Sequence, residues 1–449
     1  MRTLLLFRGA PGCGKSTYIK EHDLEKYTLS ADTIRLMCQG GQETPAGTME
    51  ISPQNDDVVW DMLFKLLEVR MSHGEFTVID ATNSKTVEIN RYKNLAKQYR
   101  YRMYIIDMTD LPIDECKRRN ALRAPLKRVP DAAIDKMYAR FATQKIPSGV
   151  TVLSSDVNVL EKLNYVPQDF NNWNKIHIIG DVHGCYSCLK EYLGDLKDDE
   201  LYIFVGDYLD RGIENVEMFK FLCDVVDNNR KNVILLEGNH ERWLNKWGHD
   251  EPVQSEEFAN YTRPQLFKAG IDHNTARKVY SRVGQCSYFD YDEKRYFVSH
   301  GGLSYLPEFL PFVSTDQMVK GVGRYPDMLT VAESWEKSMP DSYIQIFGHR
   351  NVQDVPIDMG HRCYNLEGKI EFGGYLRCVE LEHGQSIKCV ETKNDVFRKE
   401  EPKTETAVEM KTEFDNAELV SKMRQSKYVF EKRFGDISSF NFSREAFYK

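Results

Sequence analysis

Five short apolar runs between residues 176 and 350 constrain the fold most, because each ends in a Gly-rich turn that carries Asp, Asn or His. The turns are Gly-Asp-Val-His-Gly at 180–184, Gly-Asp-Tyr-Leu-Asp-Arg-Gly at 206–212, Gly-Asn-His-Glu at 238–241, His-Gly-Gly at 300–302 and Gly-His-Arg at 348–350. Such runs are typical of buried strands, so their polar side chains would gather at one edge of a sheet. The pattern predicts an α/β fold with a polar site at that edge.

The first of these turns has a spacing that suits metal binding. Asp181 and His183 are two residues apart, which places both side chains on the same side of an extended chain. Carboxylate, carboxamide and imidazole groups are ligands for borderline divalent metals. No cysteine stands within the five turns, which argues against a structural zinc site. One Asp or His alone could equally be a turn cap or a core residue, so only the joint pattern indicates a metal site.

In this order the five turns resemble those of the binuclear metallophosphoesterases, and the resemblance covers residues 176–382. It implies an αββα sandwich and two divalent metals, with Mn²⁺ expected first and Ni²⁺, Co²⁺ or Fe as alternatives. It further implies that the first metal is bound by Asp181, His183 and Asp207, and the second by Asp207, Asn239, His300 and His349. Two metals that share one carboxylate would neutralise charge on both oxygens of an in-line displacement at phosphorus.

The same resemblance implies roles for three neighbouring side chains. Arg211 corresponds to a phosphate clamp, since a guanidinium binds two phosphate oxygens at once. His240 corresponds to the group that protonates the leaving oxygen, and Asp210 is interpreted as an orienter rather than a ligand. One position departs from the family, which usually has Asn-Ile-Asp-x-Gly where this chain has Asn-Leu-Glu-Gly at 365–368. Glu367 keeps the charge but is one methylene longer, which leaves its role near the metals open.

The N-terminal third opens with a complete P-loop. An apolar run at 4–7, expected to be a buried strand, leads into Gly-Ala-Pro-Gly-Cys-Gly-Lys-Ser-Thr at 9–17 and then into a helical stretch. In this context backbone N–H groups wrap phosphates at a helix N-terminus. Lys15 should reach the β- and γ-phosphates of ATP, and Ser16 should bind Mg²⁺. The expected nucleotide-binding residues of the loop are Gly9, Gly12, Cys13, Gly14, Lys15, Ser16 and Thr17.

Charged residues after the P-loop bear on which reaction it serves. Asp32 follows a strand-like run and could take a proton from an attacking hydroxyl, although it could also cap the next helix. Asp80 ends another apolar run, at the position of a Walker-B-like acid, with a helix cap as the alternative. Arg119 and Arg123 are four residues apart in the most basic segment, which places them on one helical face. Such a face suits a lid over transferring phosphates, but also a solvated surface.

Together these segments resemble the 5′-hydroxyl polynucleotide kinases, over residues 1–155. The motifs on which this resemblance rests are the P-loop, Ser-Ala-Asp-Thr-Ile-Arg at 30–35, Ile-Asp-Ala-Thr-Asn at 79–83 and Cys-Lys-Arg-Arg-Asn-Ala-Leu-Arg at 116–123. The resemblance implies that Asp32 is the general base and that Arg35 contacts the nucleic-acid phosphate next to the acceptor hydroxyl. It also implies that Arg119 and Arg123 hold the donor phosphates.

The order of a kinase followed by a metallophosphoesterase resembles the bacterial polynucleotide kinase-phosphatases that heal broken RNA ends. That resemblance implies ATP-dependent phosphorylation of 5′-hydroxyl ends and metal-dependent removal of 2′,3′-cyclic or 3′ phosphate. RNA is the expected substrate, with DNA as a second candidate. A ligase-like domain often follows in that family, but no Lys-x-Asp-Gly motif occurs here, so we expect no ligase activity in this chain. A separate RNA ligase is then a candidate partner, and the C-terminal tail is a candidate docking element for it.

The 449 residues are expected to form a kinase domain at 1–155, a connector at 156–174, a metallophosphoesterase domain at 175–391 and a linker and tail at 392–449. No apolar run approaches the ~20 residues needed to cross a bilayer, and the scattered cysteines indicate reduced thiols. We therefore expect a cytoplasmic protein without membrane contact. The net charge of -8 argues against bulk attraction to nucleic acid, so local basic patches would have to bind it. The oligomeric state is left open.

Three other functions also fit parts of the sequence. The phosphoesterase turns are compatible with a Ser/Thr-type protein phosphatase, or with a dinucleoside-polyphosphate hydrolase, that carries a regulatory nucleotide-binding module. The P-loop domain could instead be a small-molecule kinase. A purely regulatory P-loop module would need neither Asp32 nor Arg35, so these two residues favour the nucleic-acid kinase.

Overall fold

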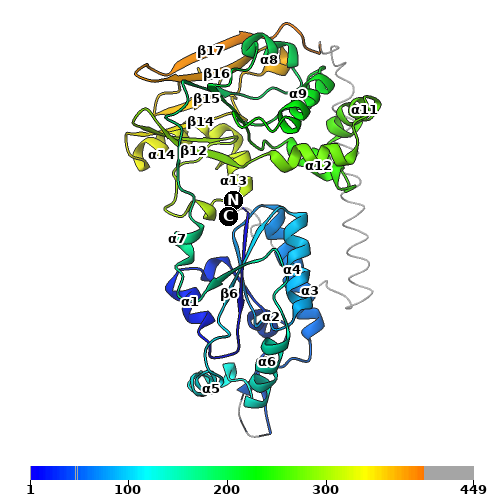
Figure 1. Cartoon of the computed structure of the whole chain (residues 1–449), viewed down its shortest axis with the longest axis vertical. Helices are drawn as coiled ribbons and strands as arrows, with labels where there is room; N and C mark the ends of the chain where they lie inside the picture. Colours follow the sequence, from blue (N-terminus) through cyan, green and yellow to red (C-terminus); the bar gives the residue numbers. More distant parts are fainter. Residues whose placement is uncertain (1, 46, 48, 399–449) are drawn as a thin grey trace, which may run out of the picture. The chain divides into compact units, whose positions relative to one another are not determined.

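The structure, a computed structural model, describes residues 2–45, 47 and 49–398 (Figure 1). The chain up to Phe397 clusters as one compact unit. Residues 399–449 lie outside the described residues, and with them most of the predicted linker and the whole tail. The last strand, β17 (Lys388–Lys393), includes Thr392 and Lys393, which the sequence analysis assigned to the linker.

The N-terminal part is built on a parallel sheet. Its elements are β1 (Thr3–Arg8), α1 (Lys15–Glu21), β2 (Thr28–Ser30), α2 (Ala31–Cys38), β3 (Gln42–Glu43), β4 (Met49–Glu50), α3 (Asp56–Ser72), β5 (Thr77–Asp80), α4 (Thr86–Gln98), β6 (Arg102–Asp107), α5 (Ile113–Ala121), α6 (Asp131–Thr143), β7 (Thr151–Ser154) and α7 (Val159–Leu163). The strand order is β2-β5-β1-β6-β7, with parallel pairing throughout. This is the P-loop NTPase-type sheet that the sequence predicts.

The central strand β1 explains why helices cover both faces of this sheet. Leu4 and Leu6 pack into a core that includes residues of α3 and α4, whereas Leu5 and Phe7 pack into a second core with residues of α1. Successive side chains of a strand point to opposite faces, so an uninterrupted apolar run is buried only if both faces are covered. Figure 1 shows α1 on one side of the sheet and α3 and α4 on the other.

The second part contains two further sheets. Its elements are β8 (Gln168–Asp169), β9 (Lys175–Ile179), α8 (Tyr186–Leu193), β10 (Glu200–Phe204), α9 (Asn215–Asp227), β11 (Val233–Leu235), α10 (Glu241–Gly248), α11 (Arg263–Lys268), α12 (His273–Arg282), β12 (Cys286–Tyr291), β13 (Lys294–Ser299), α13 (Thr315–Lys320), α14 (Met328–Ser338), β14 (Tyr343–Phe347), β15 (Cys363–Asn365), β16 (Tyr375–Glu382) and β17. One sheet has the order β11-β10-β9-β16-β17 and the other β15-β14-β13-β12-β8.

These two sheets pack face to face between layers of helices. The core between them includes Ile178 and Ile203 from one sheet and Val298 and Ile346 from the other. The outer face of the first sheet packs on residues of α8, α9, α10 and α12, and that of the second packs on residues of α13 and α14. The predicted fold class, a P-loop domain followed by an αββα sandwich, is confirmed.

The connection between α2 and α3 differs from its predicted form. The polar stretch at 39–53, which contains Gly and Pro, predicts a surface loop, but β3 and β4 pair there as a short antiparallel hairpin. Strands of two residues leave no periodic pattern in a sequence, so this pairing was missed. Among the residues that the structure describes, no helix is both long and apolar enough to cross a membrane.

Candidate functional site

The polar turns of the second part all follow strand ends, and strands of both sheets contribute them. Asp181 and His183 follow β9, Asp207 follows β10, Asn239 follows β11, His300 follows β13 and His349 follows β14. The parallel strands β9, β10 and β11 run side by side, and so do β13 and β14, so each group of turns meets at one sheet edge. The apolar runs thus place the six side chains in one region.

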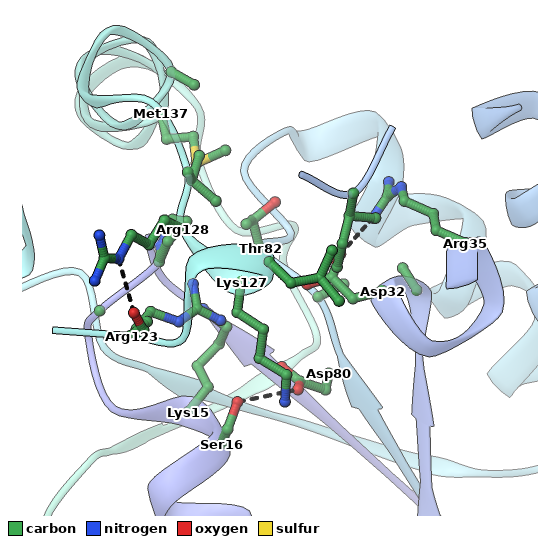
Figure 2. Close-up of a pocket in the computed structure, with 18 of the residues that line it drawn as sticks. Lys15, Ser16, Asp32, Arg35, Asp80, Thr82, Arg123, Lys127, Arg128 and Met137 are labelled. Carbon is green, nitrogen blue, oxygen red and sulfur yellow. Dashed lines mark hydrogen bonds and ion pairs between the residues drawn. The ribbon is translucent and has the colours of Figure 1, made fainter. Parts of the chain in front are cut away.

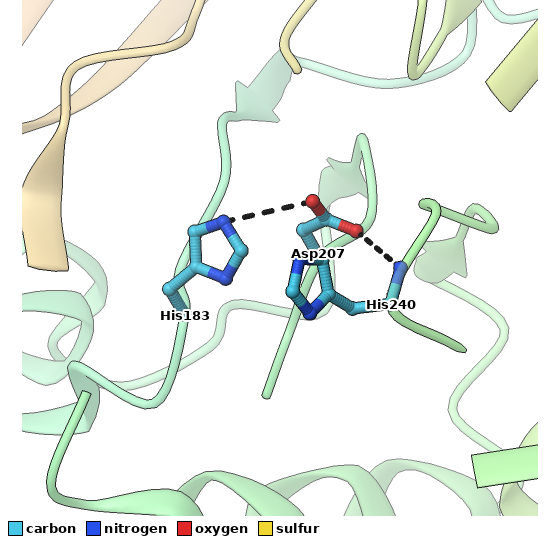
Figure 3. Close-up of side chains that lie close together, drawn as sticks. All are labelled: His183, Asp207 and His240. Carbon is cyan, nitrogen blue, oxygen red and sulfur yellow. Dashed lines mark hydrogen bonds and ion pairs between the residues drawn. The ribbon is translucent and has the colours of Figure 1, made fainter. Parts of the chain in front are cut away.

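Asp207 is the centre of this cluster. One of its carboxylate oxygens, Oδ2, lies 3.2 Å from His300 Nε2 and 3.6 Å from His183 Nε2. The ligand atoms of Asp207, His300 and His349 all lie within 4.8 Å of one another, as do those of His183, Asp207 and His240. Figure 3 shows the second of these groups. A carboxylate that belongs to two groups of ligand atoms is placed to bridge two cations.

Two buried atoms of this cluster lie 3.9 Å apart and fit a divalent cation between polar groups. Asp181 Oδ1 and His300 Nδ1 are buried, and neither has a hydrogen-bond partner in the described part of the chain. A buried polar atom without a partner is costly unless an ion or a water molecule satisfies it. The donor set of carboxylate, imidazole and the Asn239 carboxamide, whose Oδ1 lies 3.2 Å from His300 Nε2, suits borderline divalent ions. The residues that would hold two such ions are Asp181, His183, Asp207, Asn239, His300 and His349.

Two histidines of the cluster, His183 and His349, are held in the neutral form that binds metals. Burial and the positive charge of Arg211 lower the pKa of His183 to about 3. Burial and the neighbouring His300 lower the pKa of His349 to about 3. Both imidazoles are therefore neutral at neutral pH, and a neutral imidazole keeps the lone pair that a metal needs.

The carboxylates of Asp181, Asp207 and Glu367 are buried close enough to shift one another's ionisation. Burial opposes the charged form of Asp207, but the imidazoles of His300 and His240 outweigh it and hold the pKa of Asp207 well below its usual range. Burial and the charges of Glu367 and Asp207 raise the pKa of Asp181 well above its usual range. Carboxylates crowded in this way repel one another until a cation compensates them.

The backbone at the site is strained. The φ angle is 44° at His183, 50° at Asp207, 74° at Asp210, 67° at Arg211 and 70° at His349, all in the left-handed region. Such angles persist in non-glycine residues only where the surroundings enforce them. The buried carboxylate of Glu241 does so at Asp207, because it accepts hydrogen bonds from the backbone N–H groups of Asp207 at 2.9 Å, Tyr208 at 3.0 Å and Gly238 at 2.7 Å.

His240 is oriented by a buried acid. Its Nδ1 lies 2.6 Å from Oδ2 of Asp210, which is fully buried and also accepts a hydrogen bond from the Thr262 hydroxyl. The backbone N–H of His240 donates to Asp207 Oδ1 at 2.9 Å (Figure 3). Burial opposes the charged imidazolium, but Asp207 and Asp210 outweigh it and raise the pKa of His240. This arrangement fits a group that gives a proton to a leaving oxygen.

Two glutamates lie at the site, one beside Arg211 and the other beside Asp181 and His183. Glu371 Oε1 lies 2.6 Å from Arg211 Nη1. Glu367 is 4% exposed, and one of its carboxylate oxygens lies within 4.8 Å of the ligand atoms of Asp181 and His183. The longer Glu367 side chain therefore still reaches the site, where the family usually has Asp. The sequence analysis assigned no role to Glu371 or to Glu241. Glu241 could have been suspected, because it directly follows the predicted site residues Asn239 and His240, but nothing near Glu371 in the sequence points to the site.

The P-loop joins β1 to α1 as its sequence requires. Gly14 is the N-cap of α1 with φ 109°, and Gly12 has φ 87°. A Cβ atom on Gly12 would lie 2.2 Å from the carbonyl oxygen of Cys116, so only glycine fits there. Lys15 Nζ donates to two carbonyl oxygens of the loop at 2.9 and 3.0 Å. The ammonium group thus lies over the loop that would wrap the phosphates.

A cavity of about 650 Å³ opens beside this loop (Figure 2). Most of the predicted kinase residues line it, namely Gly12, Gly14, Lys15, Ser16, Thr17, Asp32, Arg35, Asp80, Arg119 and Arg123. The other two predicted residues, Gly9 and Cys13, contact Lys15 instead. Lys15 Nζ donates to the carbonyl oxygen of Gly9 at 2.9 Å and lies 3.7 Å from the sulfur of Cys13. The volume lies in the range of sites that bind small molecules and cofactors.

Asp32 and Arg35 face this cavity from α2. Asp32 Oδ1 lies 2.8 Å from Arg35 Nη1, and Arg35 Nε donates to Asp56 Oδ1 at 2.7 Å. Ser30 is the N-cap of α2, but its side chain makes no capping hydrogen bond. The Asp32 carboxylate is half exposed, at 56%, so it can meet a hydroxyl that enters the cavity.

Asp80 lies next to the residue expected to bind Mg²⁺. Its Oδ2 accepts a hydrogen bond from Ser16 Oγ at 3.5 Å. Burial raises the pKa of Asp80, and the positive charge of Lys15 partly offsets that effect. The N-cap of α4 is Lys85, so the alternative role of Asp80 as a cap of that helix is wrong. Ser16 and Asp80 are together suited to hold a hydrated Mg²⁺.

The two lid arginines do not lie on one helical face, contrary to the prediction. α5 ends at Ala121, so it includes Arg119 but not Arg123. Leu122 is its C-cap, and Pro125 follows closely, which prevents the helix from continuing. Both arginines nevertheless line the cavity. Arg119 Nε is paired with Glu115 Oε1 at 2.6 Å, in a pair exposed enough to rearrange around a nucleotide.

The chain is similar to known proteins in both parts. Residues 4–144 match the AAA domain family, and residues 174–379 match the calcineurin-like phosphoesterase family. An asymmetrical bis(5′-nucleosyl)-tetraphosphatase of Geobacillus thermodenitrificans is 30% identical over 224 residues, which cover 45% of this chain and 88% of that protein. Serine/threonine-protein phosphatase 2 of Salmonella typhimurium is 36% identical over 85 residues, which cover 18% of this chain and 36% of that protein.

A solved serine/threonine phosphatase of Saccharomyces cerevisiae is 14% identical and superposes with a TM-score of 0.36, covering 55% of this chain and 87% of that one. The predicted combination of a P-loop domain and a metallophosphoesterase domain is confirmed by the two family matches. Divalent metals are implied by the second match, and the buried ligand groups around Asp207 agree with it. The chain belongs to the calcineurin-like phosphoesterase family, and in it a P-loop, kinase-like AAA domain precedes the phosphoesterase domain.

Proposed function

We propose that this chain heals nucleic-acid ends, with RNA as the main substrate and DNA as a second one. The kinase domain would add phosphate from ATP to 5′-hydroxyl ends, and the phosphoesterase domain would remove 2′,3′-cyclic and 3′ phosphates. The observation that carries the proposal is the cavity of the P-loop domain, in which the phosphate-binding loop faces a carboxylate, Asp32, paired with a cation, Arg35. A regulatory nucleotide site would need no such acceptor side. The resulting ends suit a separate RNA ligase, which would be the functional partner.

In the kinase reaction, Asp32 would take the proton of the 5′-hydroxyl as its oxygen bonds to the γ-phosphorus of ATP. The bond from that phosphorus to the β–γ bridging oxygen breaks, and ADP leaves with the electron pair. Lys15, Arg119 and Arg123 would stabilise negative charge on the phosphates during transfer. Mg²⁺ held by Ser16 and Asp80 would supply further charge neutralisation.

In the phosphoesterase reaction, Arg211 would bind two phosphate oxygens and hold the ester in place. His240 would donate a proton to the leaving 2′ or 3′ oxygen while Asp210 holds the imidazole. Two divalent ions at the ligand set around Asp207 would supply Lewis acidity and activate water. Opening the cyclic phosphate releases one ribose oxygen and cleaving the monoester releases the other, so each step needs one proton for its leaving oxygen. His240, which must take up a new proton from solvent between the steps, could donate both.

The test uses one RNA with a 5′-hydroxyl and a 2′,3′-cyclic phosphate. The purified chain is incubated with this RNA, γ-labelled ATP, Mg²⁺ and Mn²⁺, and the products are separated. The expected result is label at the 5′ end together with loss of the 3′ phosphate. An RNA that keeps its 5′-hydroxyl, while a simple phosphomonoester is hydrolysed, would refute end healing.

A second candidate function is hydrolysis of dinucleoside polyphosphates. It is favoured by the Geobacillus relative, a tetraphosphatase of which this chain covers 88% at 30% identity. Values of kcat/KM for diadenosine tetraphosphate and for the cyclic-phosphate RNA, measured on the same preparation, decide between the two. A clear preference for the dinucleotide would make that hydrolysis the activity of the phosphoesterase domain, whatever the kinase domain does.

A further inference from the structure

The cavity of the P-loop domain is also lined by residues to which the reaction described above gives no role. Besides the residues already described, its lining includes Ile51, Pro53 and Trp60. Ile51 and Pro53 belong to the connection between β4 and α3, and Trp60 lies in the first half of α3. These three side chains are apolar, and one of them is an indole.

Trp60 is fixed next to the acceptor side of the cavity. The Cζ of Arg35 lies 6.0 Å from the centre of the indole ring. Arg35 is itself held by Asp32 at 2.8 Å and by Asp56 at 2.7 Å. The indole also packs against the core formed by α3 and α4, so protein supports it while it lines the cavity. A supported aromatic ring at a cavity wall loses little conformational entropy when a planar ligand stacks on it.

The donor side of the cavity lies elsewhere. In Figure 2, Arg123, Arg128 and Met137 lie on one side of Thr82, and Asp32 and Arg35 lie on the other. Phosphoryl transfer needs the donor and the acceptor on opposite sides of the phosphate, because attack and departure are in line. Because Trp60 contacts Arg35, it belongs to the side from which the acceptor enters.

We propose that Trp60 is a stacking platform for the nucleobase that carries the acceptor hydroxyl, so that this part of the cavity is a nucleobase subsite. The inference rests on the proposed kinase function and names the part of the acceptor that is recognised. In the described part of the chain, Arg35 Nη2 has no hydrogen-bond partner, so it can bind the phosphate next to that base. Stacking on an aromatic side chain tolerates any base, which suits an enzyme that acts on ends of many sequences.

The test compares two acceptors that differ only in the base at the 5′ end. One is a single-stranded oligonucleotide with a 5′-hydroxyl, and the other has an abasic residue at that end. Stacking on one aromatic side chain is worth roughly tenfold or more in affinity, so the intact chain should prefer the first acceptor by about that factor. Trp60→Ala should abolish the preference and Trp60→Phe should keep most of it. The matched control is Leu66→Ala, on α3 but outside the cavity lining and 44% exposed, and it should behave as the unchanged chain.

Binding and transfer are measured separately, the first by anisotropy of a labelled oligonucleotide without ATP. A base preference in binding without any phosphate transfer would refute the proposed kinase function but support the subsite. Transfer with equal efficiency to both acceptors would refute the subsite and leave the kinase function intact. A higher KM for ATP in Trp60→Ala, with the base preference unchanged, would also overturn the inference, because Trp60 would then bind the adenine of the donor. If Trp60→Ala fails to fold, the comparison of acceptors on the unchanged chain still tests whether the subsite exists, and Trp60→Leu, which keeps an apolar side chain but cannot stack, tests its assignment to Trp60.

Discussion

Nη1 of Arg211 lies 2.6 Å from Oε1 of Glu371, whose side chain is 2% exposed, while that of Arg211 is 40% exposed. The other carboxylate oxygen of Glu371 has no hydrogen-bond partner among the described residues. A buried carboxylate thus anchors one edge of the guanidinium that would clamp the phosphate. Burial opposes the charge of Arg211, but Glu371 outweighs it and raises the pKa of Arg211 above its ordinary value. Arg211 is therefore always charged and is held in place before a substrate arrives.

We predict that Glu371→Gln weakens phosphate binding by the phosphoesterase. Glutamine can still accept a hydrogen bond, but the charge that holds Arg211 is lost. A hydrogen bond between charged groups contributes about 1.5–3 kcal/mol, so kcat/KM should fall by about tenfold or more. The inhibition constant of inorganic phosphate should rise by a similar factor, which a merely structural role would not produce. Kinase activity on the same preparation is the control, and an unchanged inhibition constant would contradict the positioning role.

The two sites should be separable by single substitutions. Lys15→Ala removes a positive charge from the transferring phosphates, so kinase activity should fall at least about 100-fold, the scale of losing one preorganised donor. Phosphoesterase activity should not change. Asp181→Ala should have the reverse effect, because it removes a buried metal ligand whose Oδ1 has no hydrogen-bond partner among the described residues. Loss of both activities from either variant, with the fold retained by circular dichroism, would mean that the two domains do not act independently.

The sequence predicts those residues of the two sites that follow strand ends or belong to the P-loop, because short sequence patterns mark both kinds of segment. Asp207 and His300 are far apart in the chain, yet both could be predicted, since each follows a buried apolar run; the sequence did not show that the two runs, β10 and β13, belong to different sheets. Glu371 could not be placed, because it lies 160 residues from Arg211 and no local pattern marks the pair. The helical spacing of apolar residues at 60–71 predicts that Trp60 belongs to the core, but such spacing does not show that Trp60 also lines a cavity.

We predict that Asp207 determines the binding of both metals. Its carboxylate belongs to two groups of ligand atoms, so Asp207→Ala should reduce the metal content from two ions per chain to fewer than one. Asn239→Ala should remove only one ion, because Asn239 is a proposed ligand of the second metal alone and lies next to His300. Metal content is measured by mass spectrometry after dialysis against Mn²⁺, without an activity assay. The matched control is Asp195→Ala, at an exposed position, and it should bind two ions; equal losses in all three variants would contradict a bridging role.

Glu241 should stabilise the phosphoesterase domain by holding the strained turn of Asp207. Its carboxylate accepts hydrogen bonds from three backbone N–H groups, and burial together with the charge of Asp207 raises its pKa to about 7. In Glu241→Gln, the NH₂ group would face a backbone N–H, and at least one buried donor would lose its partner. The free energy of unfolding should then fall by about 1–3 kcal/mol, which thermal denaturation can measure.

Activity should fall with that stability, since the left-handed backbone at Asp207 would no longer be enforced and the bridging carboxylate would move. The matched control is Glu217→Gln on α9, an exposed glutamate of the same domain, which should change neither quantity. If Glu241→Gln unfolds at the same temperature as the unchanged chain but loses activity, then Glu241 acts on the site directly rather than through the turn. If both quantities are unchanged, other contacts hold the turn, and the proposed cause of the strain at Asp207 is wrong.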